Sequence, residues 1–139
     1  DIEPKYLNTV ESIFPELVGH LHLFDLSLEA PPVANISVVS ATLEHLQDPL
    51  LGLQHLLFST SNLLIVRSFF GENAELKWNH KEGAKAAYPI HQLSFKTVLS
   101  IFDKHKFKTC VLKDKATDSL PKRINEGINR TQYLVVGYR

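Results

Sequence analysis

Apolar residues occur along the chain in short blocks that are separated by polar residues, prolines and glycines. Helical spacing of the apolar positions predicts helices over residues 4–14, 48–57 and 94–106. Blocks that alternate or are continuously apolar predict strands at residues 21–25, 36–40, 63–69, 108–113 and 132–138. Strands that alternate with helices as far as residue 108 are typical of an α/β domain with a parallel sheet.

Cap residues and prolines mark where these elements begin. Asp48 can accept hydrogen bonds from free backbone N–H groups, and Pro49 suits the first turn of the helix that follows. Ser94 stands at the N-cap of the last helix. Residues 59–62 are polar and predict a break between helix and strand, whereas residues 71–92 have no clean period and predict a long irregular segment.

The end of the chain departs from this alternation. The strands at residues 108–113 and 132–138 are joined by a polar segment that contains Pro121 and Gly127 and has no helical pattern. Because parallel strands need a crossover, usually a helix, these two strands are expected to pair in antiparallel fashion. We therefore expect a mostly parallel sheet that is closed by an antiparallel C-terminal strand.

The composition is that of one globular domain. The 139 residues are 44% hydrophobic and 22% charged, which argues against intrinsic disorder. No apolar run approaches the ~18 residues of a membrane span, and the first residues show no signal peptide, so no membrane partner is expected. Cys110 is the only cysteine, which excludes an internal disulfide and predicts a buried thiol in a cytoplasmic protein.

Charge is divided unevenly between the two parts of the chain. Residues 1–61 carry eight acidic side chains and one basic side chain, and residues 62–139 carry seven acidic and fourteen basic side chains. The formal net charge of the whole is zero, so no nucleic-acid partner is expected. His20 and His22 share a face of their predicted strand, but no third ligand follows at a metal-site spacing, and no metal site is predicted.

Several motifs follow one another in a recognisable order. Residues 24–26 (FDL) end the first predicted strand, and residues 36–40 (ISVVS) are followed by residues 43–49 (LEHLQDP). Residues 88–95 (YPIHQLSF) lead into the last helix, and residues 132–138 form the last strand. In this order the motifs resemble the second half of the class I S-adenosylmethionine-dependent methyltransferases of the small-molecule type, LEHLQDP being the most specific of them.

The resemblance implies a Rossmann-like methyltransferase sheet and a single partial domain over residues 1–139, with its N-terminal part missing. The family's first strand and glycine-rich turn have no counterpart here, and we expect them upstream. The implied cofactor is S-adenosyl-L-methionine, and the implied reaction is methyl transfer to an oxygen, nitrogen or carbon atom of a small-molecule substrate. The alternative is a non-catalytic methyltransferase-like scaffold that acts as a binding or dimerisation module, for which a homodimer is one expected assembly.

The same resemblance assigns residues to the cofactor. Asp1 and Ile2 correspond to the end of the family's second strand, where an acidic residue meets the ribose. Asp25 and Leu26 correspond to the end of its third strand, whose acid contacts the adenine amino group, and Ser40 ends the fourth. From the residues alone, Asp1 is equally a frayed terminal residue, and Asp25 is equally a turn residue that accepts hydrogen bonds from its own backbone.

His45 is the candidate catalytic residue. It follows a buried strand by a few residues, where α/β proteins bind their ligands. A neutral imidazole there could accept a proton from the substrate's hydroxyl or amine as the methyl group is transferred. The alternative is a core or helix-capping histidine. Glu44 beside it is expected to be solvated or to cap a helix.

Residues that bind the methyl acceptor are expected at and after the strand at residues 63–69. Arg67 could meet an acidic group of the substrate, or it could pair with a neighbouring acid of the chain. Trp78, Tyr88 and His91 could line an apolar pocket over the substrate. The alternative is a plain surface loop that its aromatic residues anchor.

Overall fold

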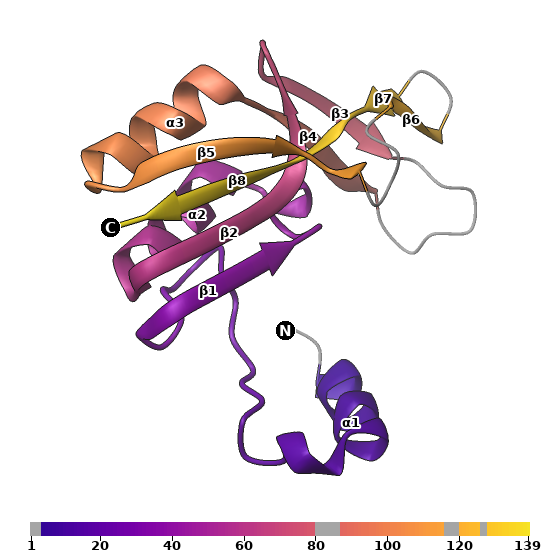
Figure 1. Cartoon of the computed structure of the whole chain (residues 1–139). Helices are drawn as coiled ribbons and strands as arrows, with labels where there is room; N and C mark the ends of the chain where they lie inside the picture. Colours follow the sequence, from indigo (N-terminus) through magenta and orange to yellow (C-terminus); the bar gives the residue numbers. More distant parts are fainter. Residues whose placement is uncertain (1–3, 80–86, 116–119, 126–127) are drawn as a thin grey trace.

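The computed structural model describes residues 4–79, 87–115, 120–125 and 128–139. A twisted sheet forms its centre, and two helices pack on one face of that sheet (Figure 1). The strands of the sheet are, in chain order, β1 (Ala34–Ser40), β2 (Thr60–Gly71), β3 (Glu75–Asn79), β4 (Tyr88–Ser94), β5 (Lys108–Lys113) and β8 (Gln132–Tyr138). A separate hairpin consists of β6 (Lys122–Asn125) and β7 (Ile128–Arg130).

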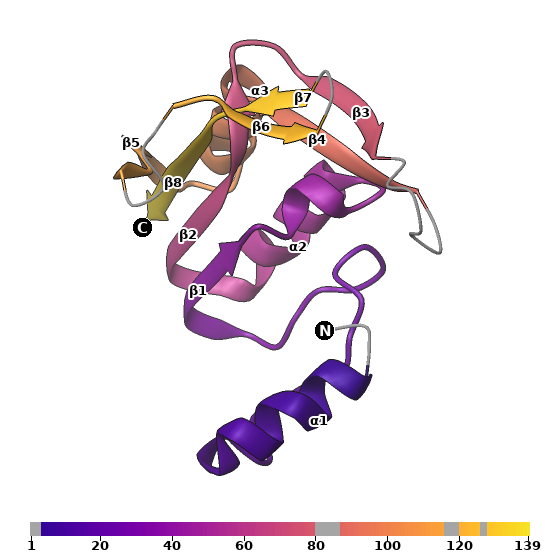
Figure 2. The same cartoon turned by 90° about the vertical axis from the view of Figure 1, so that its right-hand side faces the viewer.

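The helices differ in how they contact the sheet. The covering pair is α2 (Pro49–Ser59) and α3 (Phe95–Lys104). In contrast, α1 (Pro4–Ile13) and the short 3-10 helix η1 (Pro15–Leu17) lie apart from the sheet, as Figure 2 shows, and neither has a buried residue. The packed domain therefore consists of the sheet with α2 and α3. None of the helices in the described ranges combines the length and apolar character that crossing a bilayer requires.

β2 is the central strand of the sheet. It pairs in parallel with β1, in antiparallel fashion with β8, and in parallel with β4 at its last two residues. β5 pairs in antiparallel fashion with β8, and β3 does so with β4. Because of these pairings β1, β2, β4 and β5 run in one direction, and only β3 and β8 run in the other. The α/β class, the mostly parallel sheet and its antiparallel C-terminal strand are thus confirmed.

The predicted helix starts also have their local causes in the structure. The Oδ1 atom of Asp48 accepts hydrogen bonds from the backbone N–H groups of Leu50 and Leu51, each at 3.0 Å, so Asp48 caps α2 as predicted. Ser94 occupies the N-cap position of α3, but its hydroxyl donates to the carbonyl oxygen of Glu72 instead. Ser94 therefore ties the start of α3 to the turn after β2.

The strand predicted at residues 21–25 is wrong, because this segment is irregular. A strand needs a neighbour for its backbone hydrogen bonds, and no described strand lies beside residues 21–25. Phe24 nevertheless packs against the core and Leu26 is buried in it. The alternating pattern of residues 21–25 thus arises from their contact with the core and not from membership in the sheet.

The polar break predicted at residues 59–62 is also wrong, since β2 begins at Thr60, directly after α2. The buried hydroxyl of Thr60 donates to the carbonyl oxygen of Leu56 at 2.7 Å and hydrogen-bonds with Ser37 Oγ, also at 2.7 Å. With its polar atom satisfied by β1 and α2, Thr60 can start a buried strand.

Two segments that seemed irregular contain hairpins. β3 and β4 pair from Glu75↔Gln92 to Asn79↔Tyr88 within the segment 71–92, and β6 pairs with β7 within the polar segment before β8. Most residues of β3 are exposed, so no burial pattern marks it in the sequence. Cys110 is exposed on β5, against the expectation of a buried thiol.

The core lies between the sheet and the two covering helices. Its buried residues come from β1, β2, β4 and β8, from α2 and α3, and from the segments that lead into or out of them. They are Leu26, Val39, Leu43, Leu53, Leu56, Leu57, Leu64, Val66, Phe70, Leu93, Val98, Phe102, Phe107 and Val135.

Candidate functional site

A hollow of about 650 Å³ lies at the carboxyl end of β1. Residues 24–27, the end of β1 with the turn after it, and the residues of and after η2 (Leu43–His45) enclose it. Three predicted site residues, Asp25, Leu26 and His45, line it together. Its size falls within the ~300–1,000 Å³ of small-molecule sites, and it lies where α/β sheets bind their ligands.

The turn after β1 sets the course of the chain around this hollow. Ala41 has a φ of 54°, in the left-handed region, which costs a residue with a Cβ roughly 1–2 kcal/mol. Its backbone N–H donates to the carbonyl oxygen of Arg67 at 3.0 Å, which fixes the turn against β2. The Thr42 hydroxyl also donates to the Ser40 carbonyl oxygen at 3.2 Å. The strained turn sends the chain into η2 and so places His45 at the hollow.

Glu44 anchors η2 to the sheet. Its exposed fraction is 1%, and its Oε2 atom accepts a hydrogen bond of 2.6 Å from the hydroxyl of Ser68 on β2. The expectation of a solvated or capping acid is therefore wrong. A buried carboxylate needs a donor of this kind, and the serine at an inward position of β2 supplies it. Ser68 is a positioning residue that sequence reasoning missed, although a serine within an apolar strand is a signal for one.

His45 is held in a defined orientation by β4. Its Nδ1 atom lies 3.1 Å from the carbonyl oxygen of Pro89, and its ring meets the ring of Tyr88 edge-on, with centroids 5.3 Å apart. A carbonyl oxygen can only accept a hydrogen bond, so Nδ1 of His45 carries the proton and donates a hydrogen bond to the Pro89 carbonyl oxygen. In the neutral imidazole, Nε2 is then a hydrogen-bond acceptor, as a general base requires.

Tyr88 is in turn held by the β3–β4 hairpin. Asn79 lies directly opposite Tyr88 in the register of the two strands, and the amide Nδ2 of Asn79 donates to the Tyr88 hydroxyl. Asn79 is buried, so this contact fixes the hairpin against the site. Sequence reasoning missed Asn79 because the segment had no recognisable period.

His91 lies beside His45 but lines a different, smaller hollow of about 220 Å³ together with Asp48 and Glu75. Burial lowers the pKa of His91, while the backbone of Leu46 and the carboxylate of Asp48 partly oppose this shift. Its Nε2 atom is buried and has no hydrogen-bond partner in the described ranges. His91 thus lies next to the main hollow and is not part of its wall.

Asp25 and Leu26 form a turn in another part of the wall of the main hollow. The Oδ1 atom of Asp25 accepts a 2.8 Å hydrogen bond from the backbone N–H of Ser27, so the alternative reading of Asp25 as a turn residue is present in the structure. The side chain of Leu26 is in the core, and its carbonyl oxygen lies 2.9 Å from Nδ1 of His55. Among the described residues, none donates a hydrogen bond to the second carboxylate oxygen of Asp25, which a ligand could use.

Arg67 and Ser40 lie together on the face of the sheet that α2 and α3 leave open. The guanidinium of Arg67 donates to Asp114 Oδ2 at 2.7 Å, to Gln132 Oε1 at 2.7 Å and to Ser40 Oγ at 3.2 Å. The predicted alternative, a pair with a neighbouring acid, is therefore what the structure contains. These bonds engage all three nitrogen atoms of the Arg67 guanidinium.

Trp78 lines neither of the two hollows. Trp78 lies opposite Pro89 in the hairpin register, one position from the Asn79–Tyr88 pair, so Trp78 and Tyr88 face opposite sides of the hairpin. Asp1 and Ile2 lie outside the described residues. Within the described ranges no cluster of three or more histidine, cysteine or acidic residues is arranged to hold a metal ion.

Comparison with known proteins gives structural matches only. No protein-family model matches the sequence, and no curated protein matches it. Among solved structures, an S-adenosylmethionine-dependent methyltransferase from Mesorhizobium loti superposes with a TM-score of 0.63 at 14% identity, over 100% of this chain and 78% of that one. DesVI from Streptomyces venezuelae gives a TM-score of 0.61 at 9% identity, over 99% and 72%.

The N-terminal domain of EvdMO1, crystallised with SAH bound, gives a TM-score of 0.57 at 12% identity, over 85% of this chain and 52% of that one. The chain has the fold of a class I methyltransferase. The strands that match include the neighbouring series β1–β2–β8–β5 of the central sheet. The chain spans about half the length of the EvdMO1 domain.

Proposed function

We propose that this chain provides the C-terminal part of an S-adenosylmethionine-dependent methyltransferase domain that methylates a small molecule. The observation that carries the proposal is the hollow at the carboxyl end of β1, which Asp25, Leu26 and His45 line together. These three residues come from two segments on either side of the hollow, and the methyltransferase resemblance assigns all three to the cofactor or to catalysis.

The residues around the hollow fit an adenosyl group. Phe24, Val38 and Leu56 offer apolar surface to a purine ring, and the carboxylate of Asp25 retains an oxygen that can accept from the adenine amino group. A carboxylate acceptor beside apolar side chains favours a ligand that combines an aromatic ring with an N–H donor. S-adenosyl-L-methionine has both features.

Bound in this hollow, the cofactor would supply an electrophilic methyl group. Methyl transfer is an in-line displacement, so most of the rate can come from holding the acceptor in line and excluding water. His45 adds a proton acceptor: the bond from Nδ1 to Pro89 leaves Nε2 to take the proton of the acceptor's hydroxyl or amine. Tyr88 and the strained turn at Ala41 keep the imidazole in place.

The first test is a calorimetric titration of the chain with S-adenosylhomocysteine. We expect saturable one-to-one binding, which Asp25→Asn weakens about tenfold or more because one acceptor oxygen becomes a donor amide. The amide oxygen of the variant can still accept from Ser27, so its turn is retained. Asp103→Asn, an exposed change on α3, is the matched control and should bind as the wild type does. Absence of binding, or equal binding by Asp25→Asn, contradicts the proposal.

The second test concerns the base. In the intact enzyme, His45→Asn is expected to lower kcat by roughly 10²-fold or more, with the affinity for S-adenosylhomocysteine unchanged. His105→Asn, at the C-terminal end of α3, is the control. Full activity of His45→Asn would remove the base role and leave positioning alone to account for the rate.

A second candidate function is a non-catalytic scaffold that dimerises through β1. Among the described strands β1 pairs only with β2, and Ile36 and Val38 on it are 60% and 67% exposed. An exposed apolar edge strand favours pairing with a second copy of itself. Sedimentation analysis distinguishes the two functions: a dimer that Val38→Lys dissociates, in a chain that does not bind S-adenosylhomocysteine, would favour the scaffold.

A further inference from the structure

The hairpin β6–β7 contains a buried arginine whose hydrogen-bonding capacity is only partly used. Arg130 on β7 has an exposed fraction of 3%. Its Nη1 atom donates to Glu75 Oε2 on β3 at 3.1 Å and to the carbonyl oxygen of Asn129 at 2.9 Å. Its Nε and Nη2 atoms are buried and have no hydrogen-bond partner in the described part of the chain.

The two atoms without partners form one functional edge of the guanidinium. The N–H groups of Nε and Nη2 point in the same direction from the planar group, and such a pair binds the two oxygens of a carboxylate or phosphate side by side. Glu75 and Asn129 occupy only Nη1, so they leave this edge of Arg130 intact. A buried donor edge of this kind needs an explanation, and a bound anion is a chemically matched one.

The surrounding charges favour an anion as well. Burying a guanidinium is costly unless it is paired, and Glu75, its carboxylate partner among the described residues, has a side chain that is 48% exposed. Lys122 lies directly opposite Arg130 in the hairpin register, and Arg123 follows it. The cross-strand neighbour of Arg130 is therefore a second cation, which adds to the positive charge on this side of the hairpin.

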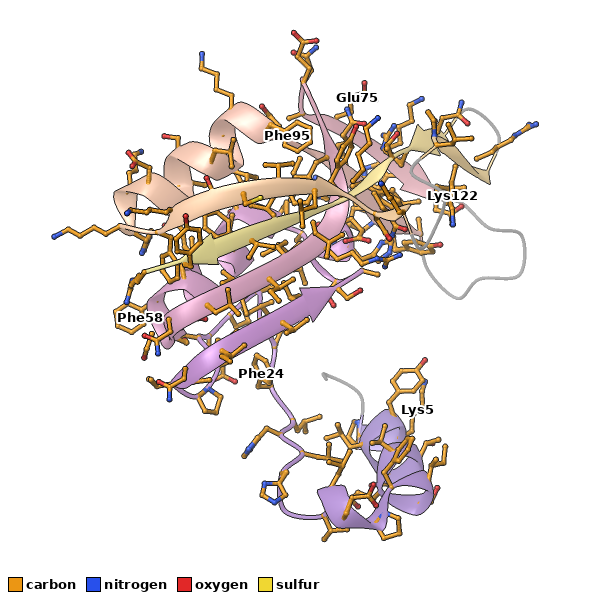
Figure 3. All side chains as sticks on the ribbon, in the orientation of Figure 1. Lys5, Phe24, Phe58, Glu75, Phe95 and Lys122 are labelled. Atoms are coloured by element: carbon orange, nitrogen blue, oxygen red, sulfur yellow. The ribbon has the colours of Figure 1, made fainter. Side chains whose placement is uncertain are left out.

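The position of the hairpin places Arg130 beside the β3–β4 pair. Both ribbon views show β6 and β7 next to β3 (Figures 1 and 2), and the bond from Arg130 to Glu75 joins the two hairpins. Figure 3 labels Glu75, at the start of β3, and Lys122, at the start of β6. Glu75 also lines the smaller hollow that contains His91.

We propose that the Nε–Nη2 edge of Arg130 is a binding site for an oxoanion, a carboxylate or phosphate group, which is either free in solution or carried by a small molecule. The anion accepts hydrogen bonds from both N–H groups at once. Together with Glu75 it neutralises the positive charge of the buried guanidinium. This site belongs to the β6–β7 hairpin and does not depend on methyl transfer or on the cofactor hollow.

The test is an NMR titration of the wild-type chain labelled with ¹⁵N-arginine. Sodium phosphate and sodium acetate are added separately, with sodium chloride at matched ionic strength as the reference. We expect a saturable shift of the Arg130 Nε–H signal with at least one oxoanion and none with chloride. Which of phosphate and acetate binds more tightly distinguishes a phosphate group from a carboxylate group as the natural anion.

Two variants form a matched pair for this measurement. Arg130→Gln should weaken oxoanion binding, measured by calorimetry, about tenfold or more. Arg123→Gln removes one positive charge from an exposed position of the same hairpin and should leave binding within about twofold. Glu75→Gln removes the competing carboxylate and should tighten binding.

Two results overturn the proposal. The first is a wild-type Nε–H signal that phosphate and acetate move no more than chloride does, which means that the edge binds water only. The second is equal weakening by Arg130→Gln and Arg123→Gln, which means that general positive charge attracts the ion. The wild-type titration decides the matter even if Arg130→Gln does not fold. A failed S-adenosylhomocysteine titration would leave this result untouched.

Discussion

The two faces of the central sheet differ in what covers them. On one face Leu64, Val66 and Val135 are completely buried beneath α2 and α3. On the other face, β1 exposes Ile36 and Val38, and β5 exposes Leu112. The strands have similar apolar residues on both faces, so the difference comes from the helices and not from the strands.

The open face has its own organisation, which is polar. Arg67 joins β2 to Asp114 after β5, to Gln132 at the start of β8 and to Ser40 at the end of β1. The covered face therefore stabilises the chain mainly by apolar burial, whereas the open face does so through one ion-pair network beside exposed apolar residues. The predictions below test this contrast in order of decreasing expected effect.

The largest loss of stability is expected from a substitution on the covered face. Phe102 on α3 is completely buried and meets the ring of Phe107 edge-on. Phe102→Ala should lower the free energy of unfolding by about 3–5 kcal/mol, measured by urea denaturation. Val38→Ala on the open face is the counterpart and should change it by no more than about 0.5 kcal/mol. Similar losses at both positions would mean that the two faces contribute alike.

The next largest loss of stability is expected from breaking the ion-pair network of the open face. Arg67→Met removes the guanidinium from Asp114, whose side chain is only 5% exposed. Loss of one partner of a buried pair is strongly destabilising, and because Arg67 is itself a quarter exposed we expect a loss of about 2 kcal/mol. Arg123→Met, at an exposed position, should cost less than about 0.5 kcal/mol. Equal urea midpoints for the two variants would show that the network adds nothing.

Gly137 and Gly71 differ in the rigidity of the side chain that an added Cβ would meet. A Cβ at Gly137 would collide with the ring of Phe102, which the core holds, and Gly137→Ala should cost about 1–3 kcal/mol. A Cβ at Gly71 would meet only the end of the flexible side chain of Gln92. Gly71→Ala should therefore cost less than Gly137→Ala in thermal unfolding, and the reverse order would mean that the core around Phe102 can adjust.

The smallest effect is a dependence of stability on pH. Burial lowers the pKa of His91 below its usual 6.5, so the unfolded chain binds a proton that the folded chain resists. Stability is therefore complete above pH 6.5 and falls as the pH drops through 6.5 toward the lowered pKa of the folded state. His91→Gln should reduce the loss in urea midpoint between pH 7 and pH 5, whereas His105→Gln should not. An unchanged slope in His91→Gln would contradict this assignment.

Much of the fold followed from local pattern. The apolar runs of β1 and β2, the cap at Asp48 and the antiparallel closing pair of β5 and β8 were all predicted, because each depends on neighbours in sequence or on the absence of a crossover helix. The hairpin of β3 and β4 was missed because β3 is mostly exposed and carries no burial period. Residues 21–25 were assigned to a strand because an alternating pattern does not reveal whether a partner strand exists.

The candidate site likewise depends partly on sequence motifs and partly on contacts between distant segments. The order of motifs in the sequence was sufficient to select Asp25, Leu26 and His45, which the structure brings to one hollow. The orientation of His45 depends on Pro89 and Tyr88, which lie more than forty residues away in sequence.

What the sequence by itself determined is therefore the helices and strands with a clear apolar pattern, together with the residue types at their ends. Only the tertiary structure decided which polar groups are buried and with whom: Glu44 with Ser68, Arg67 with Asp114, and Arg130 with Glu75. The physical reason is that propensity and capping act within a few residues of the chain. Desolvation and hydrogen bonding of a buried charge depend instead on atoms that folding brings together from distant segments.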